Sequence, residues 1–172
     1  MNPQIFLDLD GVLSDFDGHY EALFEVRPNQ DTYDPPDFWD RIREHGRFFR
    51  TQPMMKDAMV LWNAVKHLRP IILTGIPRSI PHVGHQKRQW VDEHLGRDVQ
   101  VYCCPSKDKC KWGKPGDILV DDRIKYSGYW IEMGGVFIHH TSALTSIAAL
   151  AVRVAGAFEL PSGLVELRET RG

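Results

Sequence analysis

Short apolar runs alternate along this chain with longer stretches in which apolar residues recur at helical spacing. The runs lie at residues 5–9, 71–73, 99–103, 118–120 and 136–138, and most are bounded by glycine, proline or acidic residues. Short apolar runs closed by turn signals are typical of strands buried in a sheet. The pattern therefore predicts five strands.

Helical spacing is found between these runs. It predicts helices from Phe16, over 38–45, 56–69, 83–95 and 124–133, and from Thr141 or Ser142 to about Val154. Gly46, Pro70 and Gly96 stand where three of these helices should end. Strands that alternate with helices form parallel sheets covered on both faces. We therefore predict an α/β fold: a Rossmann-like parallel sheet of about five strands, sandwiched by helices.

Residues 14–54 differ from the rest of the chain, because aromatic residues are interleaved there with many charges. A proline-containing loop at 27–37 separates two helical stretches, and Asp37 is the expected N-cap of the second. We predict a small helical cap at 14–54, inserted into an α/β core made of residues 1–13 and 55–172. The polar tail from Pro161 is expected to fray.

Composition excludes several classes of protein. The chain has 172 residues and a net charge of −2, so no basic excess marks nucleic acid as its main partner. No apolar run approaches the ~18 residues that span a bilayer, and no signal peptide is evident. The odd, clustered cysteines (Cys103, Cys104 and Cys110) favour neither a disulfide framework nor a zinc site. A reducing cytoplasm is the expected location.

Two carboxylates follow the first strand. Side chains alternate along a strand, so Asp8 and Asp10 should point the same way while Leu9 faces the core. Gly11 then permits a sharp turn. Taken alone, this pattern is more typical of an acidic turn than of a site. Two neighbouring acids at a buried position are costly to desolvate, which favours a cation or a reaction that requires them.

Other predicted strands end in polar residues as well: the second in Thr74-Gly75 and the fourth in Asp121-Asp122. In an open parallel sheet these ends meet at one edge, where ligands bind. Carboxylates converging there would hold a hard cation through oxygen, and Mg²⁺ is the expected cofactor. A hydroxyl, backbone N–H groups and a lysine would suit a phosphate beside it.

In chain order, these features resemble the four motifs of the haloacid dehalogenase superfamily. The matching residues are Asp8-Leu9-Asp10-Gly11-Val12, Thr74, a downstream lysine and Asp121-Asp122. Residues 8–16, Phe38-Trp39, Phe48-Phe49, Trp90-Val91-Asp92 and 118–123 are similar, more narrowly, to the 5'(3')-deoxyribonucleotidases. The resemblance covers residues 4–140 and implies a helical cap after the first motif.

The resemblance implies a phosphatase that works through an aspartyl-phosphate. Asp8 would be the nucleophile, and Asp10 would protonate the leaving oxygen and then activate water. Mg²⁺ would be held by Asp8, the backbone carbonyl of Asp10, and Asp122, with Asp121 acting nearby or through water. Thr74 and Gly75 would bind phosphate.

A lysine would stabilise both the phosphate and the nucleophile. Lys109 is our first choice, because it precedes the fourth strand much as the superfamily's lysine does. Lys87, Lys107 and Lys111 remain alternatives.

The expected substrate is a small phosphorylated metabolite, with (deoxy)nucleoside monophosphates as first choice. Two alternatives stay open: a phosphatase of nucleic-acid ends, which the lysines at 107–114 would serve, and a phosphate-binding protein without catalysis. Gly75 stands where the nucleotidases usually have serine, and the cap is short for that group. Both departures bear on specificity. His82 and His85 are expected to be exposed, and His139 and His140 to be structural. The sequence gives no oligomeric state.

Overall fold

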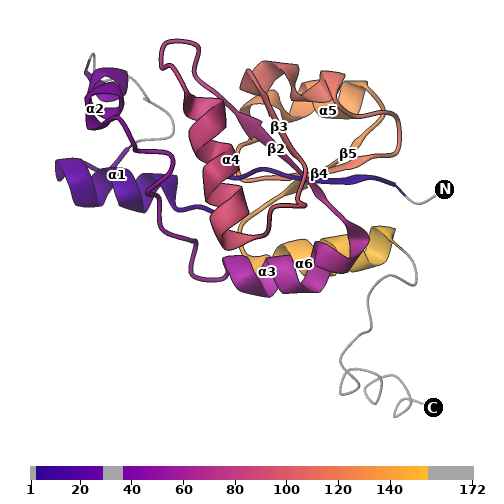
Figure 1. Ribbon diagram of the computed structural model, residues 1–172. Helices are drawn as coiled ribbons and strands as arrows, with labels where there is room; N and C mark the ends of the chain where they lie inside the picture. The colour runs from indigo at the N-terminus through magenta and orange to yellow at the C-terminus, as the bar shows by residue number, and fades with distance from the viewer. Residues whose placement is uncertain (1–2, 29–36, 155–172) are drawn as a thin grey trace, which may run out of the picture.

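A five-stranded parallel sheet forms the centre of the computed structural model, which describes residues 3–28 and 37–154 (Figure 1). The strands lie in the order β3-β2-β1-β4-β5. Their bounds are β1 (Ile5–Leu7), β2 (Ile71–Gly75), β3 (Val101–Cys104), β4 (Ile118–Asp121) and β5 (Val136–His139). The predicted Rossmann-like sheet is therefore present, with only small shifts at strand ends.

The strand order reverses at β1. Phe6 of β1 pairs on one side with Ile71 of β2 and on the other with Leu119 of β4. In an open parallel sheet, such a reversal leaves a crevice beyond the carboxyl ends of the two central strands. Asp8 follows β1 directly and so lies at this crevice.

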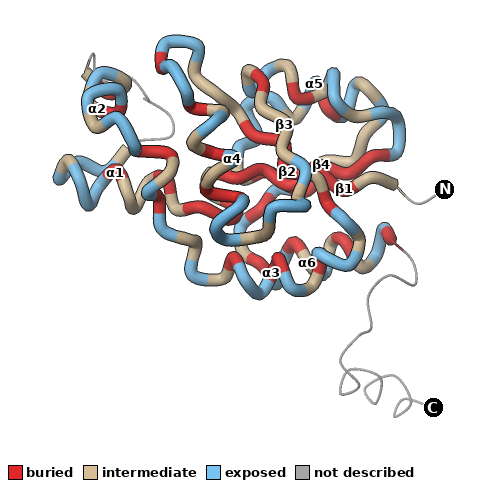
Figure 2. The backbone as a smooth tube through the Cα atoms, viewed as in Figure 1, coloured by how far each residue is buried: buried red, intermediate tan, exposed pale blue. Residues whose placement is uncertain are grey.

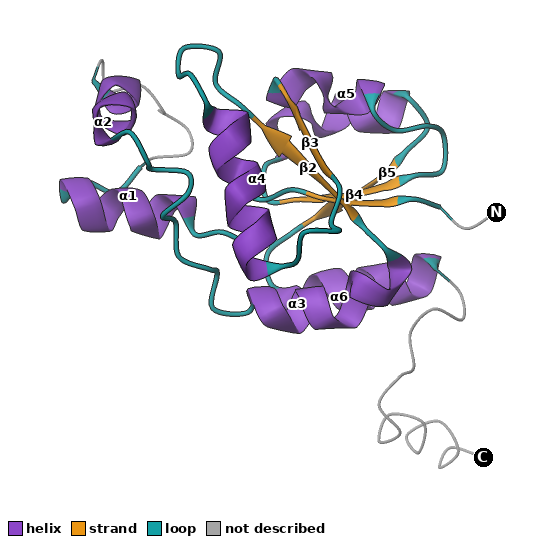
Figure 3. Cartoon of the chain, in the orientation of Figure 1, coloured by secondary structure: helices purple, strands orange, loops and turns teal. Residues whose placement is uncertain are grey.

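Helices cover both faces of the sheet (Figure 3). Alternate residues of β1 face opposite ways: Ile5 and Leu7 belong to one core and Phe6 to the other. The first core includes residues of α3 (Ala58–Val65), α4 (Val83–His94) and α6 (Ala143–Arg153). The second includes Trp130 of α5 (Ser127–Glu132). Buried residues gather along the strands and the inward sides of these helices (Figure 2).

The insertion after β1 has an apolar cluster of its own. Helices α1 (Phe16–Phe24) and α2 (Phe38–His45) contribute Phe16, Tyr20, Phe38 and Ile42, which pack with Phe48, Phe49, Ile80 and Val83. The two ends of the insertion are hydrogen-bonded together, since Met55 N donates to Leu13 O at 2.8 Å and Asp15 N to Pro53 O at 2.8 Å. The boundaries of the cap, residues 14 and 54, remain a prediction.

Some predicted helices are shorter. The stretch 56–69 contains α3 and a separate 3₁₀ turn, Lys66–Leu68, because the chain tightens before Pro70. The stretch 124–133 divides into a 3₁₀ turn, Ile124–Tyr126, and α5, because Ser127 Oγ donates to Ile124 O at 2.8 Å.

Of the predicted N-caps, Ser142 caps α6 through its side chain. Asp37 precedes α2 but makes no side-chain cap, since its carboxylate bonds Arg41 instead. Most of the loop at 27–37 and the tail from Pro161 lie outside the described residues. Within the described ranges, no helix is both long and apolar enough to cross a membrane.

Candidate active site

Three carboxylates converge at the crevice. Asp8 follows β1, Asp121 ends β4, and Asp122 follows it; each offers an oxygen within 4.8 Å of the others'. The turn after β1 allows this approach: Gly11 has φ of +77°, and a Cβ there would lie 2.2 Å from Asp122 Oδ2. Only glycine accommodates both the positive φ and the contact.

Lys109 is buried among these acids. Its Nζ lies 2.9 Å from Asp8 Oδ1 and 2.6 Å from Asp121 Oδ2. A 3₁₀ helix in the β3–β4 connection, Ser106–Lys111, carries it there. Burial by itself lowers the pKa of Lys109, but the two paired carboxylates outweigh burial and raise that pKa above its usual value. Lys109 is therefore a fixed cation that faces the nucleophile candidate.

One lysine does not neutralise three carboxylates. Burial, followed by the charges of Asp8 and Asp121, raises the pKa of Asp122 to about 8. Burial and the charge of Asp8 also raise the pKa of Asp121. Asp122 Oδ1 is buried without a hydrogen-bond partner. An unpaired carboxylate oxygen beside two further acids fits a hard divalent cation.

Asp10 has different neighbours from Asp8. Its Oδ2 accepts a hydrogen bond from Lys87 Nζ at 2.6 Å, and its Oδ1 accepts one from Ser14 Oγ at 3.2 Å. Its side chain is 25% exposed, so it still faces the cavity. The two acids that the sequence places two residues apart thus stand in separate electrostatic environments.

Lys87 is the buried partner of Asp10. Its side chain is fully buried, and Nζ also donates to Thr74 Oγ1 and Gly75 O, each at 2.8 Å. Three acceptors engage its three protons, so Lys87 holds Asp10 rather than Asp8. The structure therefore brings two of the four candidate lysines to the site, whereas Lys107 and Lys111 are exposed.

Lys87→Met is expected to lower kcat/KM for an alkyl phosphate by about a hundredfold, the lower end of the range that a positioned acid contributes, because Asp10 keeps its carboxyl but loses its anchor. The kcat/KM for p-nitrophenyl phosphate should fall much less, because its leaving group needs no proton and kcat/KM does not include the later attack of water. A structural role would lower both rates equally. Arg88→Met, at an exposed neighbouring position of α4, is the control.

The predicted phosphate-binding pair, Thr74 and Gly75, lies beside Lys87. Thr74 is fully buried, and its hydroxyl faces Lys87. Gly75 lines the cavity, and a Cβ at Gly75 would lie 2.2 Å from Ser106 Oγ. Ser106, which the sequence analysis did not single out, thus places a hydroxyl where a residue-75 side chain would stand.

A reciprocal exchange tests whether Ser106 supplies that hydroxyl. Ser106→Gly is expected to raise KM for a phosphate monoester about tenfold, the effect of losing one hydrogen bond to a charged group. Gly75→Ser alone should clash with Ser106 and lower the melting temperature. The double variant should recover both the KM and the melting temperature of wild type. If the double variant instead showed the sum of the two single effects, Ser106 would not supply the hydroxyl in place of a residue-75 side chain.

A cavity of about 750 Å³ opens over these groups. Asp8, Asp10 and Asp122 line its floor, and Phe16, Trp39 and Phe49 of the insertion line its walls. His139 and His140 also border it, whereas His82 and His85 are exposed as expected. The cavity is of the size and mixed polarity usual for small-molecule sites.

No family sequence model matches the chain. It is 29% identical over 124 residues to a protein of Vibrio phage KVP40 provisionally named a 5'(3')-deoxyribonucleotidase, an alignment that covers 72% of this chain and 68% of that one. It is 26% identical over 152 residues to the mitochondrial 5'(3')-deoxyribonucleotidase of Mus musculus, covering 73% of this chain and 66% of that one. The chain thus spans about two thirds of each relative.

Solved structures resemble the fold. A haloacid dehalogenase family hydrolase from Deinococcus radiodurans, with bound phosphate and sodium, superposes with a TM-score of 0.52 at 15% identity, covering 93% of this chain and 99% of that one. A superfamily hydrolase from Ehrlichia chaffeensis gives 0.54 at 11% identity, covering 90% and 100%. At these identities, the likenesses show that the chain shares the overall fold of those hydrolases.

Proposed function

We propose that this haloacid dehalogenase superfamily protein, similar to 5'(3')-deoxyribonucleotidases, is a Mg²⁺-dependent phosphomonoesterase acting on (deoxy)nucleoside monophosphates through an aspartyl-phosphate. One observation carries the proposal: Asp8 stands at the strand-order reversal beside a buried lysine and two further acids, while Asp10 pairs separately with Lys87. The named relatives support the substrate class. Cytoplasmic location stays a prediction.

The acids present fit a divalent cation, since Asp122 keeps a buried, unpaired oxygen beside Asp8 and Asp121. The side chains of Asp8 and Asp122 and the main-chain carbonyl of Asp10 would hold Mg²⁺, with Asp121 alongside. When bound, the ion offsets the repulsion between an anionic nucleophile and an anionic phosphate. The Asp10 side chain is turned to Lys87 and would not be a ligand.

The chain's own residues then have separate roles in the reaction. An Asp8 oxygen attacks phosphorus and the bond to the leaving oxygen breaks, while Asp10 gives that oxygen a proton. Asp10 next takes a proton from a water, which attacks the phosphorus of the aspartyl-phosphate and frees Asp8 and inorganic phosphate. Lys109 orients Asp8 by its ion pair and stabilises the charge on the transferring group.

The cavity walls fit a nucleoside. Trp39, which is half-buried, and the edges of the buried Phe16 and Phe49 line the same cavity as the acids. Aromatic rings stack on nucleobases of any sequence, at about 1–3 kcal/mol per base. A monophosphate could therefore place its phosphate at Asp8 and its base against these rings.

Phosphate release from a substrate panel tests the proposal. The panel holds 5'- and 3'-monophosphates of deoxyribonucleosides and ribonucleosides, each with Mg²⁺ and with EDTA. We expect turnover of deoxynucleotides that EDTA abolishes and Mg²⁺ restores. Absence of turnover across the panel, or turnover unaffected by EDTA, would overturn it.

Asp122 should link metal binding to pH. Its folded pKa of about 8 lies above its ordinary value of 3.8, so between these values the folded state holds a proton that the unfolded state has lost. Stability without metal should therefore fall as pH rises through this interval. Mg²⁺ should bind more tightly as pH rises toward 8, because binding releases the proton.

The melting temperature from pH 5 to 9, with EDTA and with Mg²⁺, checks this linkage. Asp122→Asn should flatten the fall in the EDTA series and remove the stabilisation by Mg²⁺. Asp92→Asn, on the exposed side of α4, is the matched control. The linkage would be wrong if wild type and Asp122→Asn showed the same pH dependence in EDTA.

A further inference from the structure

A second cavity, of about 350 Å³, also reaches Asp8. It is lined by the 3₁₀ helix Ser106–Lys111, by Arg123 after β4, and by Lys125 and Tyr126 of the 3₁₀ turn Ile124–Tyr126, and no residue of α1 lines it. The two cavities share the residues Asp8, Trp39, Ile76, Ser106 and Arg123. They are therefore two arms that meet at the nucleophile candidate.

The two arms differ in charge. The acids that line the larger cavity are Asp8, Asp10, Asp15, Asp17, Glu21, Asp57 and Asp122, against the cations Arg27, Lys56 and Arg123. The cations that line the smaller one are Arg78, Lys107, Lys109, Arg123 and Lys125, against the acids Asp8 and Asp121. The whole chain has a net charge of −2, so composition does not account for this concentration of positive charge.

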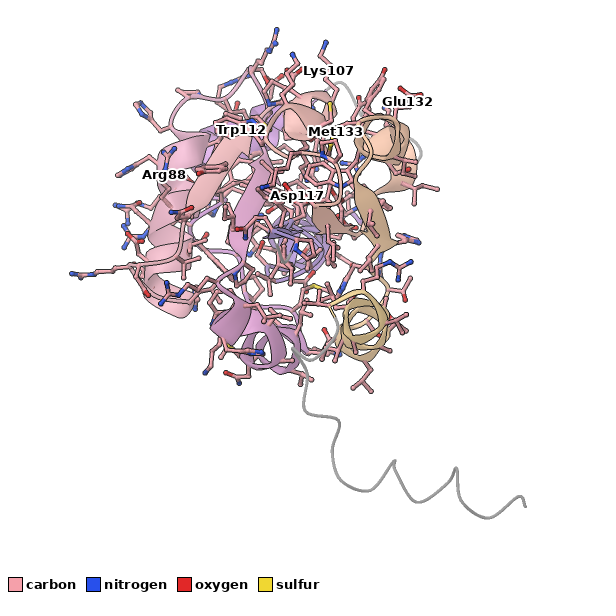
Figure 4. All side chains as sticks on the ribbon, turned by 90° about the vertical axis from the view of Figure 1, so that its right-hand side faces the viewer. Arg88, Lys107, Trp112, Asp117, Glu132 and Met133 are labelled. Atoms are coloured by element: carbon pink, nitrogen blue, oxygen red, sulfur yellow. The ribbon has the colours of Figure 1, made fainter. Side chains whose placement is uncertain are left out.

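The smaller cavity is here called the basic arm, and three separate segments supply its exposed cations. Arg78 comes from the β2–α4 loop, Lys107 from the 3₁₀ helix Ser106–Lys111, and Arg123 and Lys125 from the segment that follows β4. Lys107 projects at the upper rim of the molecule (Figure 4). Because the three segments are distant in the chain, the fold, and not a local run of lysines, builds this cluster.

Three cations of the cluster, Arg78, Lys107 and Lys125, form no ion pair with a carboxylate of the described ranges. The nearby Asp108 is paired with Lys111 at 2.7 Å, and the charges of Lys107 and Arg78 also lower the pKa of Asp108. Asp8 and Asp121, the acids that line this arm, are both paired with Lys109. Cations that gather at a concave site without an ion-pair partner favour an anionic ligand.

We propose that the basic arm binds a second phosphate group of the substrate, one that is not the group attacked by Asp8. The proposal rests on the proposed function, because it places the first phosphate at Asp8. Arg and Lys side chains are the usual protein partners of phosphate. A second phosphate in the larger cavity would instead face Asp15, Asp17 and Glu21.

The second phosphate has two chemical sources. It is either the other ester of a nucleoside 3',5'-bisphosphate or the adjacent phosphodiester of a terminally phosphorylated oligonucleotide. Tyr126 also lines the basic arm, and Lys125 Nζ lies over its ring, 5.6 Å from the ring centre. Both sources present a phosphate to the same cations, but the oligonucleotide is longer than the bisphosphate.

Steady-state kcat/KM with Mg²⁺ is measured for three substrates: a deoxynucleoside 5'-monophosphate, the corresponding 3',5'-bisphosphate and a 5'-phosphorylated tetranucleotide. The double variant Lys107→Glu, Lys125→Glu reverses two charges of the basic arm. The control, Lys66→Glu, Lys114→Glu, makes the same change in net charge at exposed lysines that line neither arm.

We expect the basic-arm variant to lose about tenfold or more on the substrates with a second phosphate and to change little on the monophosphate, with losses that shrink as salt rises. A loss confined to the bisphosphate identifies the small molecule as the source, and a loss that extends to the tetranucleotide identifies the strand. Equal changes on all three substrates, or no preference of wild type for a second phosphate, would overturn the proposal.

A binding measurement separates this inference from the proposed function. Calorimetric titration of Asp8→Asn with the monophosphate and with the bisphosphate needs no turnover. Tighter binding of the bisphosphate, lost in the basic-arm double variant, supports the second site even if no panel substrate is hydrolysed. Equal affinities for the two nucleotides would refute the second site while leaving the phosphatase proposal to its own test.

Discussion

Asp8→Asn should abolish phosphate release, lowering kcat by at least about 10⁴-fold, as removal of a nucleophile does in other covalent mechanisms. An amide does not form the acyl-phosphate bond, and the nearby acids have other partners or roles. Asp10 is held by Lys87, Asp121 is paired with Lys109, and Asp122 would hold the metal.

The same variant should remain folded. Asp8 shares the crevice with Asp121 and Asp122, so its neutralisation relieves repulsion among like charges, while Lys109 keeps its 2.6 Å pair with Asp121. We expect the melting temperature without metal to stay level or to rise. Release of phosphate measured over long incubation, with Asp92→Asn as control, checks the loss. Activity near the wild-type level would exclude Asp8 as nucleophile.

Lys109→Met should lower kcat by about 10²–10³-fold, the range found when one preorganised donor to a developing charge is removed. It should also destabilise the metal-free protein by about 3–5 kcal/mol, since the two carboxylates that Lys109 faces are then buried without a counter-charge. Both effects follow from the two ion pairs of Lys109 Nζ, which lies 2.9 Å from Asp8 Oδ1 and 2.6 Å from Asp121 Oδ2.

Mg²⁺ separates the two effects of this substitution. A cation near Asp8 and Asp122 should restore much of the lost stability, so the rise in melting temperature on adding Mg²⁺ should exceed that of wild type. The rate should stay low, because the ammonium donor is still missing. Lys111→Met, at an exposed lysine of the same 3₁₀ helix, is the control. A variant of normal rate would show that Lys109 serves stability alone.

The sequence predicts the sheet well because each strand is a short apolar run that ends in polar residues. Parallel strands then bring those ends to one edge, so the proximity of Asp8, Asp121 and Asp122 follows from topology. The position of Lys109 is harder to predict from the sequence. Lys109 belongs to the β3–β4 connection, and the hydrophobic pattern there does not indicate a 3₁₀ helix.

Lys87 shows a signal that sequence reasoning could have used. It falls on the buried stripe of α4 with Val83, Trp90 and Val91, at helical spacing. A lysine on such a stripe must find acceptors inside the protein. The sequence does not say that those acceptors are Asp10, Thr74 and Gly75 O, since this depends on how α4 packs against the sheet.

Ser106 and the basic arm carry no comparable signal. Ser106 reaches Gly75 because the 3₁₀ helix Ser106–Lys111 lies against β2, and the cations of the arm come from segments that are distant in the chain. Such convergence is a product of tertiary structure. A near-neutral net charge conceals it.

Rapid acid quench during a single turnover tests whether Asp8 carries the phosphoryl group. A deoxynucleoside monophosphate labelled on phosphorus is mixed with enzyme and Mg²⁺, and the protein is examined for a hydroxylamine-sensitive label. We expect transient label on the peptide that contains Asp8, formed before free phosphate appears and absent from Asp8→Asn. Phosphate release without labelled protein, or label on another residue, would contradict it.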